Sequence, residues 1–100
     1  MKISMAYVTF ANKKDAEKIS EIIIKEEYAK CVNIFKINSM YKWKNKVNKD
    51  DEYVCIYKMK KTKYSKFKKK MEQIHPFEVP CIIEINPSNV NEEYAKWLGE

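Results

Sequence analysis

Cysteine and histidine side chains are the residues of this sequence best suited to hold a soft or borderline metal ion. The chain has three cysteines, Cys31, Cys55 and Cys81, and a single histidine, His75. Thiolate and imidazole ligands suit copper and zinc. The cysteines are odd in number and form no CxxC pair, so their spacing matches no zinc finger and no disulfide framework. We expect reduced thiols in a cytoplasmic protein.

The sequence around each candidate ligand indicates what role is open to it. Cys55 and Cys81 lie among apolar neighbours in predicted strands, where a free cysteine packs as a small hydrophobic residue. Cys31 begins a predicted strand, and both a packing role and a ligand role are open for it. His75 comes directly before a proline at the end of a predicted helix, where its charge would favour the helix dipole. A structural role and a ligand role are therefore both open for His75.

Composition excludes several classes of enzyme. The 100 residues make one domain, 1–100, with Gly99 as the only glycine. A Walker loop, a dinucleotide-binding turn and a glycine-rich lid each need glycine at a phosphate. All 20 basic residues are lysine, which leaves no arginine for a bidentate phosphate contact. Ser39 has no nucleophile elbow around it. We predict no enzymatic activity and no organic cofactor.

Charge and hydropathy bear on the partners of the chain. The net charge of +6 and the isoelectric point near 9.1 are typical of proteins with an anionic partner. An AT-rich coding sequence would give the same lysine excess, because isoleucine and asparagine are also abundant. The basic-glycine-aromatic motif of RNA-binding modules is missing from segment 53–57. No apolar run approaches the ~18 residues of a membrane span. We expect neither nucleic acid nor membrane as a partner.

Hydrophobic periodicity predicts elements in the order β-α-β-β-α-β-α. Strands are expected at 2–10, 31–43, 52–60 and 79–85, and helices at 13–28, at 64–74 and after Asn91. In the last helix we expect an Asn91 cap and three side chains facing the core: Tyr94, Trp97 and Leu98. Asn45 is the residue of the central turn best able to take a positive φ. The pattern predicts an α+β fold, a ferredoxin-like βαββαβ sandwich with an extra C-terminal helix.

The strand predicted at 31–43 is too long for a monomer of this size. Its 13 residues span about 43 Å at ~3.3 Å each, whereas a 100-residue globule is about 34 Å across. The long hairpin should therefore project beyond the body and carry Tyr41 and Trp43 near its tip, unless a bulge or twist folds it back. Exposed aromatic residues on a strand edge promote aggregation unless another chain covers them. We predict an obligate homo-oligomer held by this hairpin.

Five groups of residues, in order along the chain, resemble the CutA family of divalent-cation tolerance proteins. They are Cys31-Val32-Asn33, Ser39-Met40-Tyr41-Lys42-Trp43, Glu52 with Lys58, His75-Pro76-Phe77-Glu78-Val79-Pro80 and Tyr94-Ala95-Lys96-Trp97-Leu98. The resemblance runs essentially from end to end. Asn45, Met59 and Phe77 stand where the family usually has glycine, threonine and tyrosine. Asparagine can take the backbone angles of the glycine, whereas Met59 and Phe77 lack the usual hydroxyl groups.

The resemblance implies a ferredoxin-like subunit of a cytoplasmic homotrimer, a link to copper and other divalent cations, and a similarity to trimeric PII signalling proteins. With it, Cys31 and His75 become the candidate metal ligands. It also implies a cleft between subunits that contains Tyr41, Trp43, Glu52, Lys58, Tyr94 and Trp97. Our first hypothesis is a non-enzymatic trimer that binds copper or another divalent cation. The alternative is a PII-like sensor or scaffold that binds a small anion through Lys58 and nearby lysines.

Overall fold

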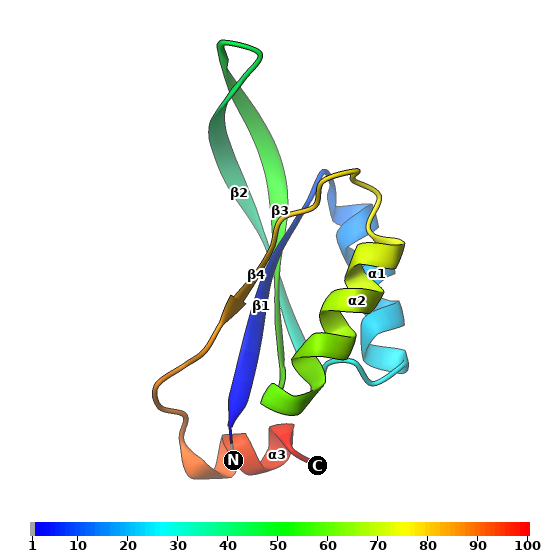
Figure 1. The fold of residues 1–100 in the computed structure, drawn as a ribbon, viewed down its shortest axis with the longest axis vertical. Helices are drawn as coiled ribbons and strands as arrows, with labels where there is room; N and C mark the ends of the chain where they lie inside the picture. The colour runs from blue at the N-terminus through cyan, green and yellow to red at the C-terminus, as the bar shows by residue number, and fades with distance from the viewer. Residues whose placement is uncertain (1) are drawn as a thin grey trace.

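Two helices cover one face of a four-stranded antiparallel sheet (Figure 1). The computed structural model describes residues 2–100. Its elements are β1 (Ile3–Phe10), α1 (Lys13–Lys25), β2 (Cys31–Trp43), β3 (Lys46–Lys60), a 3₁₀ turn η1 (Lys61–Lys63), α2 (Tyr64–Ile74), β4 (Ile82–Ile85) and α3 (Glu92–Leu98). The strand order is β2-β3-β1-β4. The predicted α+β class and the order of its elements are confirmed, and none of the helices within residues 2–100 is long and apolar enough to cross a membrane.

Helix α1 begins as predicted and ends earlier than predicted. The Asn12 side chain accepts a hydrogen bond from the Asp15 N–H at 2.8 Å, which caps the first turn. The predicted end at residue 28 is wrong, because the helix stops at Lys25. Glu27 has a φ of 60°, and this left-handed conformation cannot continue a helix. The Lys63 ammonium donates to the Glu27 carbonyl at 2.6 Å and so places a cation at this helix end.

The core lies between the sheet and helices α1 and α2. Its largest fully buried side chains come from the inner faces of β1 and β3 and from both helices: Val8, Phe10, Ile23, Cys55, Tyr57, Met59, Phe67 and Met71. The stripe predicted for α2 is confirmed, because Phe67 and Met71 are buried while Tyr64 and Ile74 pack at the edge of the core. A buried hydrogen bond of 2.8 Å joins the hydroxyls of Ser20 and Tyr57.

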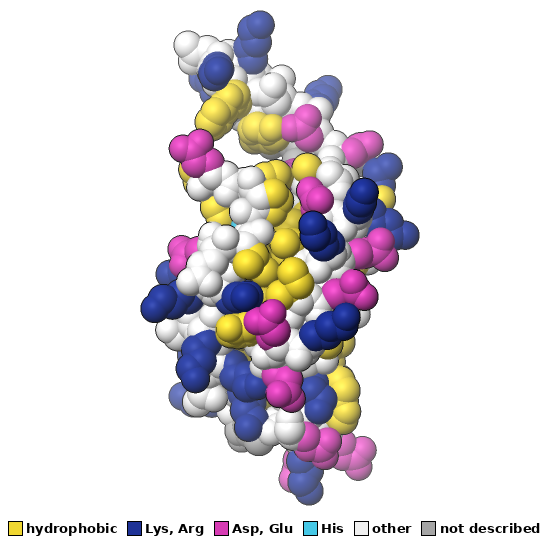
Figure 2. Space-filling model, turned by 90° about the vertical axis from the view of Figure 1, so that its right-hand side faces the viewer, with side chains coloured by type: hydrophobic (Ala, Val, Ile, Leu, Met, Phe, Trp, Pro, Cys, Tyr) yellow, Lys and Arg dark blue, Asp and Glu magenta, His cyan; other side chains and the backbone are white. Residues whose placement is uncertain are grey.

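The side of the molecule that carries α1 and α2 presents both signs of charge. Figure 2 looks onto this side and shows lysine and acidic side chains on either side of a hydrophobic strip. The exposed lysines of α2 include Lys66, Lys68 and Lys69, and Lys70 pairs with Glu26 at 3.2 Å. The lysine-rich helix therefore contributes to a mixed surface and not to one continuous basic face.

The hairpin of β2 and β3 extends beyond the body, as its length predicts (Figure 1). The molecule measures 45 × 26 × 21 Å, and the hairpin does not fold back. Strand β3 begins at Lys46 and not at residue 52, which corrects the sequence prediction. Lys44 and Asn45 have φ angles of 51° and 61° and form a two-residue turn. Positive φ at both positions fits the twist of a hairpin; the sequence indicated this for Asn45 alone.

The C-terminal third departs from prediction in three details. β4 begins at Ile82 and not at residue 79, and Val79 is 87% exposed. Cys81 thus precedes the strand in which it was expected. In α3, Leu98 is buried, but Trp97 is 40% exposed and does not face the core as predicted. Asn91 begins this helix through its main-chain carbonyl, which accepts from the Ala95 N–H, with no side-chain cap.

Candidate inter-subunit site

The strand register divides the predicted cleft residues into two groups. Lys58 pairs with Cys31 near the N-terminal end of β2, next to α3. Glu52 pairs with Ile37, and Tyr41 and Trp43 lie farther out on the projecting hairpin. Glu52 and Lys58 are six residues apart on β3, a distance of about 20 Å. One chain alone therefore does not bring the predicted cleft residues together.

The first group lies next to α3, at the end of the molecule opposite to the hairpin tip (Figure 1), and we call it the base cluster for this position. It consists of Lys30, Lys58, Tyr94 and Trp97. The Lys58 Nζ donates to the Tyr94 hydroxyl at 3.4 Å and lies 5.4 Å from the centre of its ring. Tyr94 stacks on Trp97 with ring centres 5.7 Å apart, and the Lys30 Nζ lies 4.9 Å from the Trp97 ring. Cation–π contacts of this kind hold an ammonium without neutralising it. Among residues 2–100, neither lysine forms an ion pair.

The second group contains Tyr41 and Trp43 and lies on the hairpin, next to polar side chains of β2 and β3. The Tyr41 hydroxyl donates to the Asp50 carboxylate, and this hydrogen bond raises the pKa of Tyr41. Asn38 donates to Asp51 at 2.5 Å across the same strand pair. Trp43 is 63% exposed. The group is an exposed aromatic surface, and Tyr41 is held as a neutral phenol.

His75 is held at the end of α2 by contacts to both of its ring nitrogens. Its Nε2–H donates to the Thr9 carbonyl at 2.8 Å, and its Nδ1 accepts from the Phe77 N–H at 3.0 Å. The ring stacks on Phe10 at 4.6 Å and meets Phe77 edge-on at 4.8 Å. Burial lowers the pKa of His75, so the ring is neutral. Both ring nitrogens are already hydrogen-bonded within the chain, which favours a structural role for His75 over the predicted role as a metal ligand.

The three cysteines lie in different surroundings. Cys55 is buried within 3.5 Å of the Ser20 hydroxyl, which agrees with a packing role, and burial raises the pKa of its thiol. Cys81 is half-buried, and burial raises the pKa of this thiol too. Cys31 is half-buried at the start of β2, beside Lys58 on β3.

Cys31 and His75 do not form a metal site within one chain. Cys31 pairs with Lys58, whereas Thr9, which binds the His75 ring, pairs with Val54. Lys58 and Val54 are four residues apart on β3, which separates the two positions by about 13 Å along the strand. In the described part of the chain, no three His, Cys, Asp or Glu side chains are grouped so that they could hold a metal. Among residues 2–100, one chain alone therefore does not offer three such donor side chains in one place.

The sheet face opposite to α1 and α2, which we call the open face, is largely apolar, although Thr9, Asn33 and Glu52 also lie on it. The register places on it the side chains of Tyr7, Phe35, Ile37, Ile56, Ile83 and Ile85. Phe35 is 43% exposed, and Ile83 is 53% exposed. Contiguous apolar surface of this kind marks an interaction site. Cys31 and Lys58 lie on the same face, at its lower end in Figure 1, next to α3.

Known proteins resemble this chain over nearly its whole length. The model of the family described as CutA1 divalent ion tolerance protein matches residues 4–100. The chain belongs to the CutA1 family. It is similar to the divalent-cation tolerance protein CutA of Pyrococcus horikoshii, with 34% identity over 96% of this chain and 94% of that protein. The CutA protein of Thermotoga maritima is 32% identical over 96% of this chain and 95% of its own length.

Solved CutA1 structures share the fold. The crystal structure of CutA1 from Ehrlichia chaffeensis superposes with a TM-score of 0.94 and 34% identity, covering 98% of this chain and 94% of that one. The Archaeoglobus fulgidus structure, titled as a periplasmic divalent cation tolerance protein, has a TM-score of 0.91 and 27% identity, with coverages of 96% and 94%. The family resemblance seen in the sequence is thus confirmed.

Sequence motifs identified Lys58, Tyr94 and Trp97, which the structure brings into one cluster, but they did not identify Lys30. Lys30 reaches Trp97 from the loop before β2, and a contact between such distant positions leaves no local pattern. The one sequence signal that pointed toward Lys30 was its neighbour Cys31, which belongs to a motif characteristic of the family.

Proposed function

We propose that this CutA1-family chain forms a homotrimer that contributes to divalent-cation tolerance and catalyses no reaction. The open face carries this proposal, because its apolar side chains and the projecting hairpin both lack cover in one chain. A second and third copy of the chain would bury them. The strand order β2-β3-β1-β4 and the helices on one face support a ferredoxin-like subunit. The names of the relatives support the role in cation tolerance.

Copper is the proposed cation, and Cys31 is the proposed ligand. Copper favours thiolate ligands, and the Cys31 thiol is the one that lies at the lower end of the open face. Assembly through this face would bring further donors from neighbouring subunits toward it. His75 is left out of the proposed ligand set because its nitrogens bind Thr9 and Phe77.

Native mass spectrometry of the reduced protein, with and without copper, tests this proposal. We expect a species of three times the 12.0 kDa chain mass that takes up copper in a fixed ratio. Cys31→Ser should abolish the uptake, whereas Cys81→Ser, which alters another half-buried thiol, should leave it unchanged. Equal uptake by both variants would overturn the ligand assignment. A monomeric species would overturn the trimer.

A small organic anion is the second candidate ligand of this trimer, in keeping with a PII-like sensor or scaffold. The observation that favours it is the Lys58 ammonium, which is half-buried against Tyr94 and forms no ion pair in the described chain. A partly desolvated cation without a counter-ion favours an anionic ligand. The hairpin of a neighbouring subunit, with Tyr41 and Trp43, would close such a site.

Thermal unfolding with a panel of nucleotides and organic acids tests this second function. A ligand at 100 times its Kd stabilises the folded state by about 2.7 kcal/mol, which gives a rise in Tm of several degrees. Lys58→Gln should remove most of that rise, and Lys68→Gln, at an exposed lysine of α2, should keep it. A panel without any shift, or equal shifts in both variants, would count against an anion at Lys58.

We also propose a cytoplasmic location. The three cysteines of the chain are unpaired, as is usual in a reducing compartment. The Archaeoglobus fulgidus relative is described as periplasmic, so the family name alone does not decide the compartment. Cell fractionation with an antibody to this protein distinguishes the two locations.

A further inference from the structure

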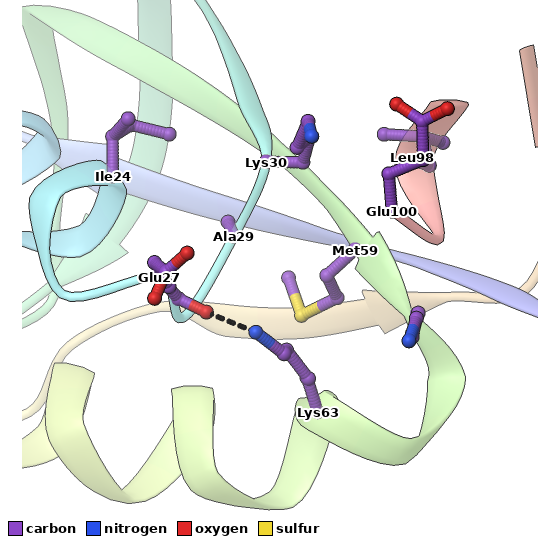
Figure 3. A pocket seen from close by; sticks show the side chains of 9 residues that line it. Ile24, Glu27, Ala29, Lys30, Met59, Lys63, Leu98 and Glu100 are labelled. Atoms are coloured by element: carbon purple, nitrogen blue, oxygen red, sulfur yellow. Dashed lines mark hydrogen bonds between the residues drawn. The ribbon is translucent and has the colours of Figure 1, made fainter. Parts of the chain in front are cut away.

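We propose a second ligand site, complete within one chain, for a small organic anion with an apolar tail. The site is a pocket of about 270 Å³, which we call the base pocket (Figure 3). It lies between the loop after α1, the end of β3, η1 and α3, and its lining includes Ala29, Lys30, Met59, Lys60, Lys63 and Leu98. Met59 belongs to the inner face of the sheet, and Lys58, on the other face, does not line the base pocket.

The floor of the base pocket is apolar and buried. Ala29, Met59 and Leu98 are each less than 5% exposed, and they come from three different elements. Figure 3 shows the Met59 thioether directed into the space between η1 and the loop after α1. Such a floor gains free energy by covering an apolar group, at about 25 cal/mol per Å² removed from water. A wholly polar ligand would forgo this contribution.

The rim of the base pocket is positive. Lys30, Lys60 and Lys63 are half-buried, whereas the acidic lining residues Glu27 and Glu100 are exposed to water. None of the three lysines forms an ion pair within residues 2–100. The lysine charges are therefore partly desolvated, while the carboxylates are screened by solvent. An anionic head group at this rim would supply the missing counter-charge.

Two of the rim lysines are already positioned by the fold. The Lys63 Nζ donates to the Glu27 carbonyl across the base pocket, as Figure 3 shows. The Lys30 Nζ is held 4.9 Å from the Trp97 ring centre. Both side chains have lost much of their rotamer freedom before a ligand binds, which lowers the cost of binding.

The size of the base pocket limits the ligand to a short chain, and its lysine rim favours an anionic head group. A water molecule occupies about 30 Å³ of the liquid, so 270 Å³ corresponds to a ligand of about nine heavy atoms. A straight-chain carboxylate such as hexanoate has this size, one charge for the lysine rim and one tail for the floor.

NMR titration of the full-length protein with sodium hexanoate tests the base pocket. We expect a saturable shift of the Met59 methyl resonance, assigned with Met59→Leu. 1-Hexanol, which lacks the charge, and acetate, which lacks the tail, should each bind at least about tenfold more weakly, because each gives up one of the two contributions. Lys60→Gln should weaken hexanoate binding by a similar factor, and Lys68→Gln should not change it.

Three results would overturn the base pocket: no Met59 shift, equal binding of hexanol and hexanoate, or unchanged affinity in correctly folded Lys60→Gln. Cys31→Ser and Lys58→Gln should bind hexanoate as the unmodified protein does, because neither residue lines this pocket. Failure of the base pocket thus leaves the trimer, copper binding and the Lys58 anion site untouched, and their failure leaves the base pocket intact.

Discussion

Ile83→Lys is expected to leave the fold of the single chain intact and to dissociate the proposed homotrimer. Ile83 lies on the open face opposite Tyr7 and is 53% exposed in one chain, so a lysine there meets water in a monomer. In the assembly its ammonium would be buried among apolar side chains, at a cost of several kcal/mol. Each 1.4 kcal/mol is a factor of ten. We therefore expect the dissociation constant to rise at least about 1000-fold.

Light scattering after size-exclusion chromatography measures this effect, with circular dichroism as the check on folding. Ile83→Val keeps the site apolar and β-branched, and it should remain trimeric. Trp43→Lys tests the hairpin independently of the open face, because it changes a hairpin residue and leaves the open face within the body unchanged. Dissociation by both lysine variants is expected if hairpin and face are buried together. A folded trimer of Ile83→Lys would show that the open face is not the interface.

Within the body of the molecule, burial periodicity was enough to predict the type and order of the elements, although the end of α1 and the start of β4 were predicted wrongly. Phe67 and Met71 lie on the face of α2 that covers the sheet, and this contact determines the spacing that the sequence displays. On the hairpin this signal fails. Residues 46–51 form strand against β2 and are mostly exposed on both faces in one chain. All of them except Val47 are polar, so the sequence of this segment resembles a loop. The length of the hairpin depends on the pairing of β2 with β3, and the sequence of neither strand alone determines that pairing.

The candidate site shows the same difference between local and distant information. Sequence context around His75 predicted the end of α2, because a proline follows it. The partner of its Nε2 is the Thr9 carbonyl, 66 positions away, and this contact is what determines the role of the ring. The motifs likewise named the cleft residues without showing that one chain divides them between the base cluster and the hairpin. Short motifs can single out candidate residues, but their spatial grouping depends on the fold.

Acid is expected to destabilise the protein through His75, which is its only histidine. Protonation would place a hydrogen on Nδ1, where the Phe77 N–H now donates at 3.0 Å. Burial opposes the charged ring and lowers its pKa, although the Thr9 carbonyl and the charge of Asp15 act in the opposite direction. The neutral ring is thus favoured in the folded state. The contribution of His75 to the free energy of unfolding is therefore greatest above the unfolded-state pKa of 6.5. It decreases as the pH drops below 6.5 and stays constant below the lower folded-state pKa.

His75→Gln should remove this pH dependence and lower stability even at pH 7.5. Glutamine can donate to the Thr9 carbonyl but loses the stacking on Phe10 and leaves the partly buried Phe77 N–H without its acceptor. We expect a loss of about 2–3 kcal/mol, measured by urea unfolding at one protein concentration. Between pH 5 and 7.5 most carboxylates stay ionised, so the slope that the variant loses belongs to His75. An NMR titration with a His75 pKa above 6.5, or an undiminished slope in His75→Gln, would contradict the structural role, because only a neutral ring can accept from Phe77 while donating to Thr9.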